Sequence, residues 1–138
     1  MEAGAPGGSS QEVVGVGING LGTIGRGVLK KLWGQPGVRI VGVNDLADPR
    51  ALADLLEFDT SYGHWGKKVE AKDGGLVIDG ERVPLTQVRS PAELGWGERG
   101  DDVVVAEATG RFTSREAAAG HLRAGAKRVI ISAPGDDT

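Results

Sequence analysis

The sequence predicts an α/β fold: a doubly wound, mostly parallel sheet with an antiparallel hairpin insertion. Two patterns predict it. Apolar runs typical of buried parallel strands occur at 13–18, 38–43, 103–107 and 128–132. Residues with helical spacing follow the first three runs, whereas the stretch 68–85 has the two-residue period and the Asp-Gly turns of antiparallel strands.

The first strand leads directly into a glycine-rich turn, in which Gly20, Gly22 and Gly25 make the pattern G-x-G-x-x-G. In such a turn the first glycine allows the tight bend, the second lets a pyrophosphate approach the main chain, and the third lets the next helix pack close to the strand. The helix then directs its unpaired N–H groups and the positive end of its dipole toward the same place. The turn therefore predicts a phosphate-binding site.

The context of the turn separates three interpretations. A tight turn without a ligand is one of them, because the chain has 24 glycines in 138 residues. A P-loop is excluded, because Gly25 is followed by Arg26 and Gly27 and no hydroxyl is placed for magnesium. Asp45 stands twenty residues beyond Gly25, at the end of the second strand, where a dinucleotide site needs a carboxylate for the adenosine ribose. Strand, turn, helix and acid together predict a Rossmann-like dinucleotide-binding fold.

The next helix is predicted to begin at Pro49, with Asp48 as its N-cap, and to end near Phe58. Its expected buried face consists of three leucines: Leu52, Leu55 and Leu56. The polar and aromatic loop at 59–66 is interpreted as a connector, with His64 as a surface residue.

The hairpin insertion contains three short strands. Pro84 in the last of them predicts an edge strand, because proline cannot donate to a ladder. Ser90 and Glu93 then predict a capping box for a short helical turn.

The third helix is introduced by a second capping box, Thr113 and Glu116, and ended by Gly125. His121 is interpreted as a solvated residue of this helix, and the three tryptophans of the chain as packing residues. The residues expected to pack the helix on the sheet are Ala117, Ala118, Leu122 and Ala124.

Four long parallel strands are fewer than the roughly six of a complete doubly wound domain. We therefore expect at least one strand to follow Thr138, so that the fold is C-terminally incomplete. The predicted division of the chain is a disordered tail at 1–12 and a dinucleotide-binding domain at 13–138 that lacks its final strand.

Composition excludes several classes of function. Sixteen basic and nineteen acidic residues give a net charge of −3 without a basic run, which argues against nucleic-acid binding. The absence of cysteine excludes disulfides, thiolate metal sites and cysteine nucleophiles within these residues, and no metal site is predicted. Since neither a signal peptide nor a membrane span is evident, a soluble, cytoplasmic protein is expected.

With these residues described, the sequence resembles phosphorylating, NAD-dependent glyceraldehyde-3-phosphate dehydrogenases, specifically their N-terminal cofactor-binding portion. The resemblance covers nearly everything from Val13 to Gly135. The motifs that carry it are GINGLGTIGR at 17–26, VNDL at 43–46, FDTSYG at 58–63, EATGRF at 107–112 and GAKRVIISAP at 125–134.

The resemblance implies a site for NAD. By similarity, the glycine turn and the start of its helix line the pyrophosphate, Asn44 and Asp45 hold the adenosine side, Arg89 approaches the adenine, and Ser132 lies near the nicotinamide half. The implied cofactor-binding residues are Asn19, Gly20, Gly22, Thr23, Ile24, Gly25, Asn44, Asp45, Arg89, Thr109, Gly110 and Ser132. Thr23 departs from the family pattern, which usually has arginine there, and Ser90 replaces a common acidic residue. A carboxylate at Asp45 would repel the 2′-phosphate of NADP, so NAD is the expected cofactor.

In the family a cysteine thiolate attacks the aldehyde and a histidine acts as base. This chain has no cysteine, and neither of its histidines aligns with that base, so no catalytic residue is assigned. The chain alone is expected to be inactive and to lack the catalytic domain. In the complete enzyme, a homo-tetramer in this family, it would serve the glycolytic oxidation and phosphorylation of a small phosphorylated aldehyde, glyceraldehyde 3-phosphate, to 1,3-bisphosphoglycerate.

Two alternatives stay open at this point. One is a fragment of the related erythrose-4-phosphate dehydrogenase, a group that tends to carry glutamate where Asp45 stands. The other is a non-catalytic, stand-alone NAD-binding module.

Overall fold

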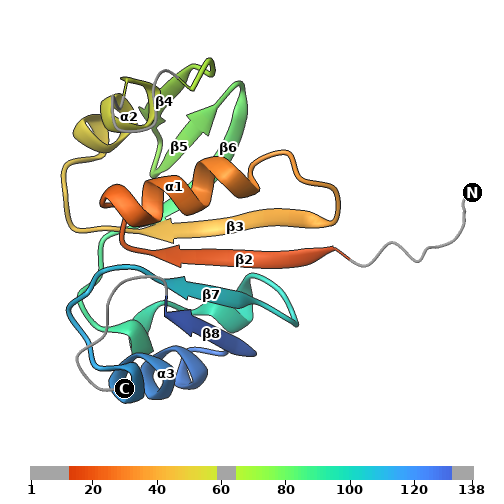
Figure 1. The fold of residues 1–138 in the computed structure, drawn as a ribbon, viewed down its shortest axis with the longest axis vertical. Coiled ribbons are helices and arrows are strands. Elements are labelled where there is room, and N and C mark those ends of the chain that lie inside the picture. The colour runs from red at the N-terminus through yellow and green to blue at the C-terminus, as the bar shows by residue number, and fades with distance from the viewer. Residues whose placement is uncertain (1–12, 59–64, 132–138) are drawn as a thin grey trace, which may run out of the picture.

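The computed structural model describes residues 13–58 and 65–131. Figure 1 shows a twisted sheet that runs through the molecule, with helices against it. The elements, in chain order, are β2 (Val14–Asn19), α1 (Thr23–Leu32), β3 (Val38–Asn44), α2 (Pro49–Phe58), β4 (Val69–Lys72), β5 (Gly75–Ile78), β6 (Glu81–Thr86), the 3₁₀ turns η1 (Pro91–Glu93) and η2 (Trp96–Glu98), β7 (Val104–Glu107), α3 (Ser114–Arg123) and β8 (Arg128–Ile131).

The sheet of the described residues has the strand order β4-β5-β6-β3-β2-β7-β8. The neighbours from β6 to β8 are parallel, whereas β4, β5 and β6 are joined as antiparallel neighbours. From β2 the chain therefore winds outward to β3 and β6, returns, and continues on the other side with β7 and β8. This reversal beside β2 is the topological switch point of a doubly wound sheet. The predicted fold class, with its antiparallel insertion, is confirmed.

The prediction that Pro84 marks an edge strand is wrong. β6 lies inside the sheet, antiparallel to β5 on one side and parallel to β3 on the other. Leu85 donates its N–H to the carbonyl of Gly74 at 3.1 Å, so the nitrogen of Pro84 faces the opposite side, toward β3. Pairing with β3 begins only at Leu85, and the proline thus interrupts no hydrogen bond of that ladder. β6 is also the fifth parallel member, one more than the sequence predicts.

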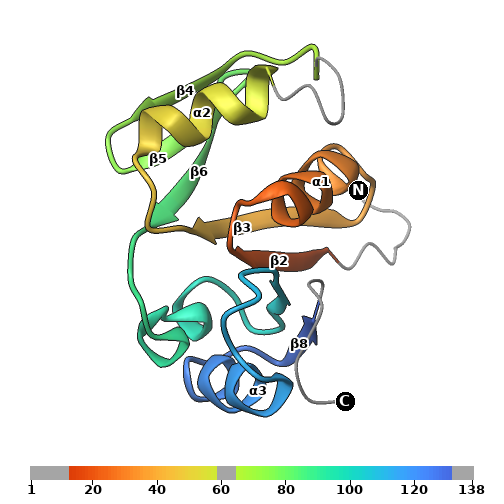
Figure 2. The same cartoon turned by 60° about the vertical axis from the view of Figure 1, so that its left-hand side comes forward.

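The core is divided between the two faces of the sheet, because successive strand residues point to opposite faces. Ile40 of β3 belongs to a large cluster with Leu29 of α1, whereas the next residue, Val41, belongs to a smaller cluster around Trp96. Val43 also belongs to the large cluster, because the register of β2 and β3 shifts by one residue between Val16 and Gly17 and the alternation shifts with it. Figures 1 and 2 show α1 on one side of β2 and β3, and α3 beside β8 at the other end of the sheet.

Two of the expected helix faces are corrected by the structure. In α2 the buried residues are Leu52, Ala53 and Leu56, whereas Leu55 is 43% exposed. The three- and four-residue spacing of the helix places position 55 at the margin of the face that packs on β4 and β5. In α3, Leu122 is exposed in the same way, whereas the small residues Ala117 and Gly120 are buried and Gly120 lies against Pro91 of η1.

The two predicted capping boxes have different outcomes. Thr113 accepts the N–H of Glu116 at 3.0 Å and Glu116 accepts the N–H of Thr113 at 3.0 Å, which confirms the box before α3. The side chain of Ser90 makes no cap hydrogen bond. Because η1 is a single 3₁₀ turn, the N–H of Glu93 bonds to the carbonyl of Ser90 instead, at 3.0 Å.

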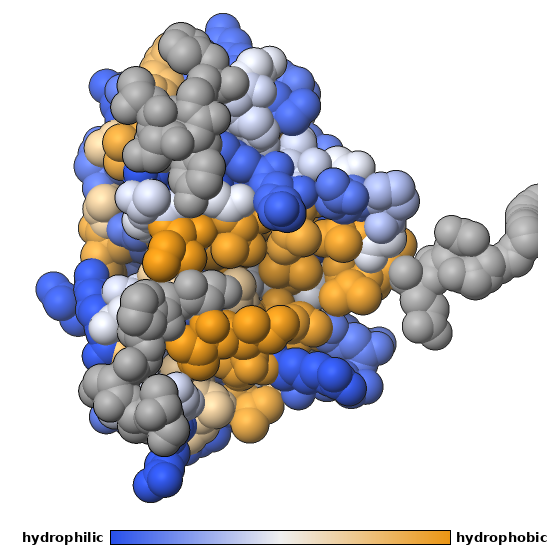
Figure 3. Space-filling model, in the orientation of Figure 1, coloured by the Kyte–Doolittle hydropathy of each residue, from blue (hydrophilic) through white to orange (hydrophobic). Residues whose placement is uncertain are grey.

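Part of the sheet surface is apolar and open. Figure 3 shows an apolar band across the middle of the molecule, over β2, β7 and β8. Val14 on β2 and Ile130 on β8 are exposed large apolar residues. None of the helices in the described ranges combines the length and the apolar character that a membrane crossing requires.

Candidate cofactor site

A pocket lies at the carboxyl ends of the parallel strands, beside the switch point. It is lined by residues that end or follow four different strands: Asn19, Gly20, Asn44, Asp45, Leu46, Val88, Arg89, Thr109, Arg111 and Phe112. This is the edge at which open α/β sheets bind their ligands. A second hollow, between the start of α2 and the β4–β5 turn, does not touch the glycine-rich turn.

The three glycines of the turn have three different surroundings. Gly20 has a φ of 102° and packs against Ala108 and Thr109, so a side chain there would be strained and crowded. A Cβ on Gly25 would overlap the carbonyl oxygen of Gly20, so the close contact of α1 with the turn needs glycine. A Cβ on Gly22 would meet no protein atom within 4 Å. The turn is thus packed at its two ends and open in the middle, as the binding of a pyrophosphate requires.

The N-terminus of α1 is adjacent to this open middle. Gly22 is its N-cap and provides no side-chain hydrogen bond, and the first turn contains no acidic residue. Thr23 and Ile24 are exposed there. The partial positive charge of the helix end is therefore not neutralised by a side chain of this turn, which favours an anion. Arg26 stabilises the turn, because its Nη1 donates to the carbonyl of Leu21 at 2.9 Å.

Asp45 ties the end of β3 to the glycine turn. Its Oδ2 accepts the N–H of Leu21 at 2.7 Å, and its Oδ1 accepts the N–H of Ala47 at 2.8 Å. Each carboxylate oxygen can accept a second hydrogen bond. The half-buried carboxylate is therefore held in a defined position at the pocket and can still accept bonds from hydroxyl groups.

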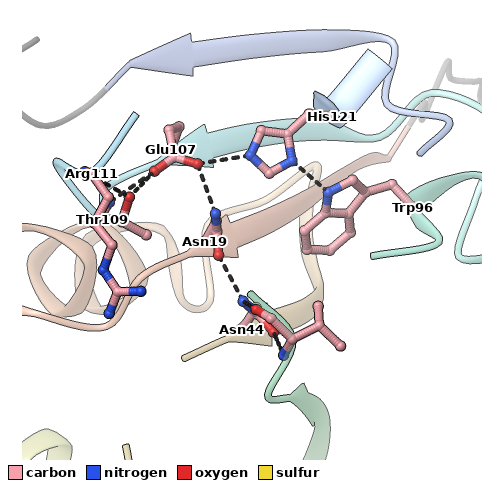
Figure 4. Close-up of polar contacts among 8 residues, drawn as sticks. Asn19, Asn44, Trp96, Glu107, Thr109, Arg111 and His121 are labelled. Carbon is pink, nitrogen blue, oxygen red and sulfur yellow. Dashed lines mark hydrogen bonds and ion pairs between the residues drawn. The ribbon is translucent and has the colours of Figure 1, made fainter. Parts of the chain in front are cut away.

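A buried hydrogen-bond network lies behind the pocket, centred on Glu107 at the end of β7 (Figure 4). Oε1 of Glu107 accepts bonds from Nδ2 of Asn19 at 2.7 Å and from Nε2 of His121 at 2.8 Å. Oε2 accepts bonds from the N–H of Thr109 at 2.9 Å and from its hydroxyl at 2.6 Å. The carboxylate thus binds together β2, α3 and the segment that follows β7.

The network continues from Asn19 to the neighbouring strands. Nδ2 of Asn44 donates to Oδ1 of Asn19 at 2.8 Å and to the carbonyl of Val88 at 2.9 Å. Oδ1 of Asn44 accepts the hydroxyl of Thr86 at 2.7 Å and the N–H of Val88 at 3.0 Å. Both asparagines are buried. The ends of β2, β3, β6 and β7, which carry the pocket, are therefore held in register by side chains.

Glu107 has a lowered pKa. Burial by itself raises the pKa of this carboxyl, but the hydrogen bonds from His121, Thr109 and Asn19 outweigh that effect and hold the pKa below its ordinary value. The charged form is therefore the native form at neutral pH.

The interpretation of His121 as a solvated residue is wrong. Its side chain is 0% exposed and lies between Glu107 and Trp96, whose indole N–H donates to Nδ1 of the histidine at 3.0 Å. The reason is that position 121 lies on the same face as two small buried residues, Ala117 one turn before it and Ala124 about one turn after it. That spacing is visible in the sequence and could have shown that this histidine is buried. Trp96 is a packing residue, as predicted, and in addition a hydrogen-bond donor.

The structure brings six of the twelve predicted site residues into the pocket: Asn19, Gly20, Asn44, Asp45, Arg89 and Thr109. Gly22, Thr23 and Ile24 form the adjacent open helix start, and Gly25 is buried beneath it. Gly110 follows Thr109 with a positive φ of 71°. Ser132, the loop residue His64 and the predicted tail at 1–12 lie outside the described residues.

Four pocket residues were not assigned from the sequence: Leu46, Val88, Arg111 and Phe112. Each follows an assigned residue or precedes one within two positions. The sequence feature that could have identified them is their position shortly after a strand end. Two of them, Arg111 and Phe112, belong to the motif EATGRF at 107–112.

The strand order, the open glycine turn and the carboxylate at the end of β3 together define a dinucleotide-binding domain of the Rossmann type. Comparison with known families agrees with this class. Residues 14–115 match the family model described as glyceraldehyde 3-phosphate dehydrogenase, NAD binding domain. The chain belongs to the glyceraldehyde-3-phosphate dehydrogenase family, and its domain is the NAD-binding one.

Curated relatives support the same assignment. The chain is 56% identical to glyceraldehyde-3-phosphate dehydrogenase 1 of Trichormus variabilis over 122 residues. The aligned region covers 88% of this chain and 35% of the relative. The chain is 50% identical over 126 residues to the enzyme of Mycoplasma pneumoniae, covering 91% and 37%. With the enzyme of Geobacillus stearothermophilus the identity is 50% over 119 residues, covering 86% and 35%. The chain thus spans little more than a third of the length of these relatives.

Proposed function

We propose that this chain is the cofactor-binding part of an enzyme that oxidises and phosphorylates glyceraldehyde 3-phosphate to 1,3-bisphosphoglycerate. The observation that carries the proposal is the match of residues 14–115 to the family's NAD-binding domain, on a chain whose glycine turn is open at Gly22. When bound, NAD supplies the acceptor for the hydride of the aldehyde. The role of this chain is to bind and orient that cofactor.

In this proposal each part of the site recognises one part of the dinucleotide. The pyrophosphate lies over Gly20 and Gly22 and against the first-turn N–H groups of Thr23 and Ile24. Gly25 contributes indirectly, since its lack of a side chain lets α1 approach the turn. These are backbone contacts, so the threonine at position 23, where the family usually has arginine, is compatible with binding.

The adenosine half is proposed to occupy the pocket. Asp45 accepts hydroxyl groups of the ribose, with Asn44 positioned beside it by the network. Arg89, Thr109 and Gly110 then lie along the cofactor. Ser132, outside the described residues, is assigned to the nicotinamide half on the resemblance alone.

The chemical step needs groups that this chain does not contain. The 138 residues include no cysteine, so the chain itself has no thiol that could attack an aldehyde. We infer that the thiolate, the base and the phosphate sites belong to other residues of the complete enzyme. A homo-tetramer and a cytoplasmic location, where glycolysis takes place, are the corresponding expectations for that enzyme.

The proposal is tested by two measurements on the purified chain. Calorimetric titration should show binding of NAD in preference to NADP, and an assay with NAD, phosphate and glyceraldehyde 3-phosphate should show no turnover. A chain that binds neither nucleotide would overturn the cofactor assignment. Turnover by the chain alone would overturn the inference that the reacting groups lie elsewhere.

A further inference from the structure

Glu107 is buried, charged and not part of the pocket wall. It is 2% exposed, and its two carboxylate oxygens accept four hydrogen bonds. Two of its partners, Asn19 and Thr109, do line the pocket. A buried charge is costly unless it is fully hydrogen-bonded, so these four donors are held firmly around it. Any effect of Glu107 on a ligand must pass through these two partners.

The carboxylate determines the direction of the whole network. An ionised carboxylate only accepts, so Asn19 must turn its amide nitrogen toward Glu107 and its oxygen toward Asn44. Asn44 must then turn its nitrogen toward Asn19 and its oxygen toward the N–H of Val88. One charge thus orients two side-chain amides and, through Val88, the backbone next to Arg89.

His121 completes this arrangement from the core. The indole of Trp96 can only donate, so Nδ1 of His121 must be the unprotonated acceptor. The proton of the neutral ring therefore lies on Nε2, which donates it to Glu107. The two rings are essentially inaccessible, at 0% and 1% exposure. Trp96 selects the tautomer, and the tautomer provides the fourth donor to the carboxylate.

We propose that Glu107 is a positioning residue of the cofactor pocket and that His121, in the tautomer selected by Trp96, holds it in place. The pair keeps Asn19, Asn44 and Thr109 in the orientation in which the adenosine half of NAD is bound. The inference rests on the proposed NAD site and extends it into the core, since neither His121 nor Trp96 lines the pocket.

The test is a set of variants of the chain, each titrated with NAD by calorimetry. His121→Leu removes both hydrogen bonds of the ring, and the affinity for NAD should fall about tenfold, the effect of losing one good hydrogen bond from the pocket lining. His121→Gln presents an N–H donor and an oxygen acceptor at a similar separation, and should restore the affinity to within about threefold of the parent.

Leu76→Ala provides the matched control for loss of stability. Leu76 is fully buried in β5, remote from the network, and its truncation lowers stability without touching the pocket. NAD affinity of this folded variant should equal that of the parent. If His121→Leu does not fold, Trp96→Phe replaces it, because this change removes the indole donor and keeps a smaller aromatic ring in its place. A loss of affinity of about threefold is then expected.

The outcomes distinguish a failure of the proposed NAD site from a failure of the positioning role of Glu107 and His121. A parent chain that does not bind NAD contradicts the proposed function itself. A parent that binds NAD, with His121→Leu or Trp96→Phe binding it equally well, overturns the positioning role alone. A loss of affinity in Leu76→Ala as large as that in the network variant, or no rescue by His121→Gln, also overturns it, because the effect would then be general destabilisation.

A spectroscopic signature adds an independent readout. The ¹⁵N shifts of the imidazole nitrogens should show a neutral ring protonated on Nε2 for His121, and the signal is assigned by its absence in His121→Gln, since the chain has two histidines. In Trp96→Phe, Nε2 still faces the Glu107 carboxylate and should stay protonated, whereas the shift of Nδ1 should change because that nitrogen loses its hydrogen-bond donor. A ring protonated on Nδ1 in the parent would contradict the proposal.

Discussion

Asp45 is the residue at which cofactor selectivity is expected to reside. Its two oxygens accept the N–H groups of Leu21 and Ala47, so the charge is held at the pocket and cannot swing away from a ligand. A phosphate on the neighbouring ribose hydroxyl would place a second negative charge against it. Selectivity for NAD over NADP is therefore a matter of repulsion as well as of hydrogen bonding.

Asp45→Ala should narrow the preference for NAD over NADP by about tenfold, since the repelling charge is lost along with a hydrogen-bond acceptor. The measurement is a pair of titrations with the two nucleotides. Asp54→Ala, which removes the same charge from an exposed position of α2, is the matched control and should leave the ratio unchanged. Equal ratios in Asp45→Ala and the parent would contradict the assignment of this carboxylate.

Glu107 makes the free energy of unfolding depend on pH in the acid range. Because its pKa is lower in the folded chain than its ordinary value, the unfolded chain takes up a proton at a higher pH than the folded one. The stability that Glu107 confers is complete above the ordinary carboxyl range and is lost as the pH falls through the lowered folded pKa.

Glu107→Gln should lower the free energy of unfolding at pH 7 by about 3 kcal/mol, because an amide cannot accept all four donors. It should also flatten the decline of stability between neutral and acid pH. Urea unfolding over that pH range measures both effects, with the exposed Glu81→Gln as control. An acid decline as steep in Glu107→Gln as in the parent would show that other groups cause it.

At the scale of elements, the junction of β2 and α1 contains one glycine that packing requires and another that is proposed to serve binding. Gly25 is in contact with the turn, whereas Gly22 faces open space with a φ of −73° that any residue can adopt. The two glycines are required for different reasons, and substitution by alanine distinguishes them.

Gly25→Ala should destabilise the chain by on the order of 2–3 kcal/mol, because α1 must move away from the carbonyl of Gly20. Gly22→Ala should leave stability within about 0.5 kcal/mol of the parent and yet weaken NAD binding, because its methyl group occupies the space proposed for the pyrophosphate. Thermal unfolding and NAD titration measure the two properties. Undiminished NAD affinity in Gly22→Ala would place the pyrophosphate elsewhere.

The two sequence-predicted capping boxes make a matched pair. Thr113→Ala removes the hydrogen bond to the N–H of Glu116 and should cost about 1 kcal/mol. Ser90→Ala removes a side chain without a cap bond and should cost no more than about 0.5 kcal/mol. Urea unfolding of both variants is the measurement. Equal losses would mean that Ser90 stabilises η1 in another way.

At the scale of the whole molecule, the winding of the chain makes β2 the centre of the described sheet. It is hydrogen-bonded to β3 and to β7, whereas β4 and β8 each have one neighbour among the described residues. β2, the strand that leads into the glycine turn, is thus hydrogen-bonded to a neighbour on each side. This pairing makes the cofactor site next to it rigid.

The rates of amide hydrogen exchange should differ between the central strand β2 and the strands β4 and β8. The hydrogen-bonded amides of β2 should exchange about a hundredfold or more slowly than those of β4 and β8, because edge strands open locally and β2 opens only when the domain unfolds. Exchange followed by NMR provides the measurement. Protection of β8 equal to that of β2 would indicate that the whole sheet opens as one unit.

The sequence by itself determined the fold class, the capping box of α3 and the position of the pocket. These depend on local features: strand periodicity, glycine spacing, and polar residues directly after a strand, all of which act over a few residues. The parallel strands then bring Asn19, Asn44 and Thr109 to one edge without further information.

Only the tertiary structure decided which groups face each other across the chain. That Pro84 lies inside the sheet depends on where pairing with β3 begins, and that Leu55 is exposed depends on which side of α2 meets β4. The hydrogen bond between Asn19 and Glu107 joins residues 88 positions apart, and His121 is buried because α3 packs against η1 and β8. The physical reason is that burial and hydrogen-bond direction are set by contacts between distant segments, to which local sequence patterns do not respond.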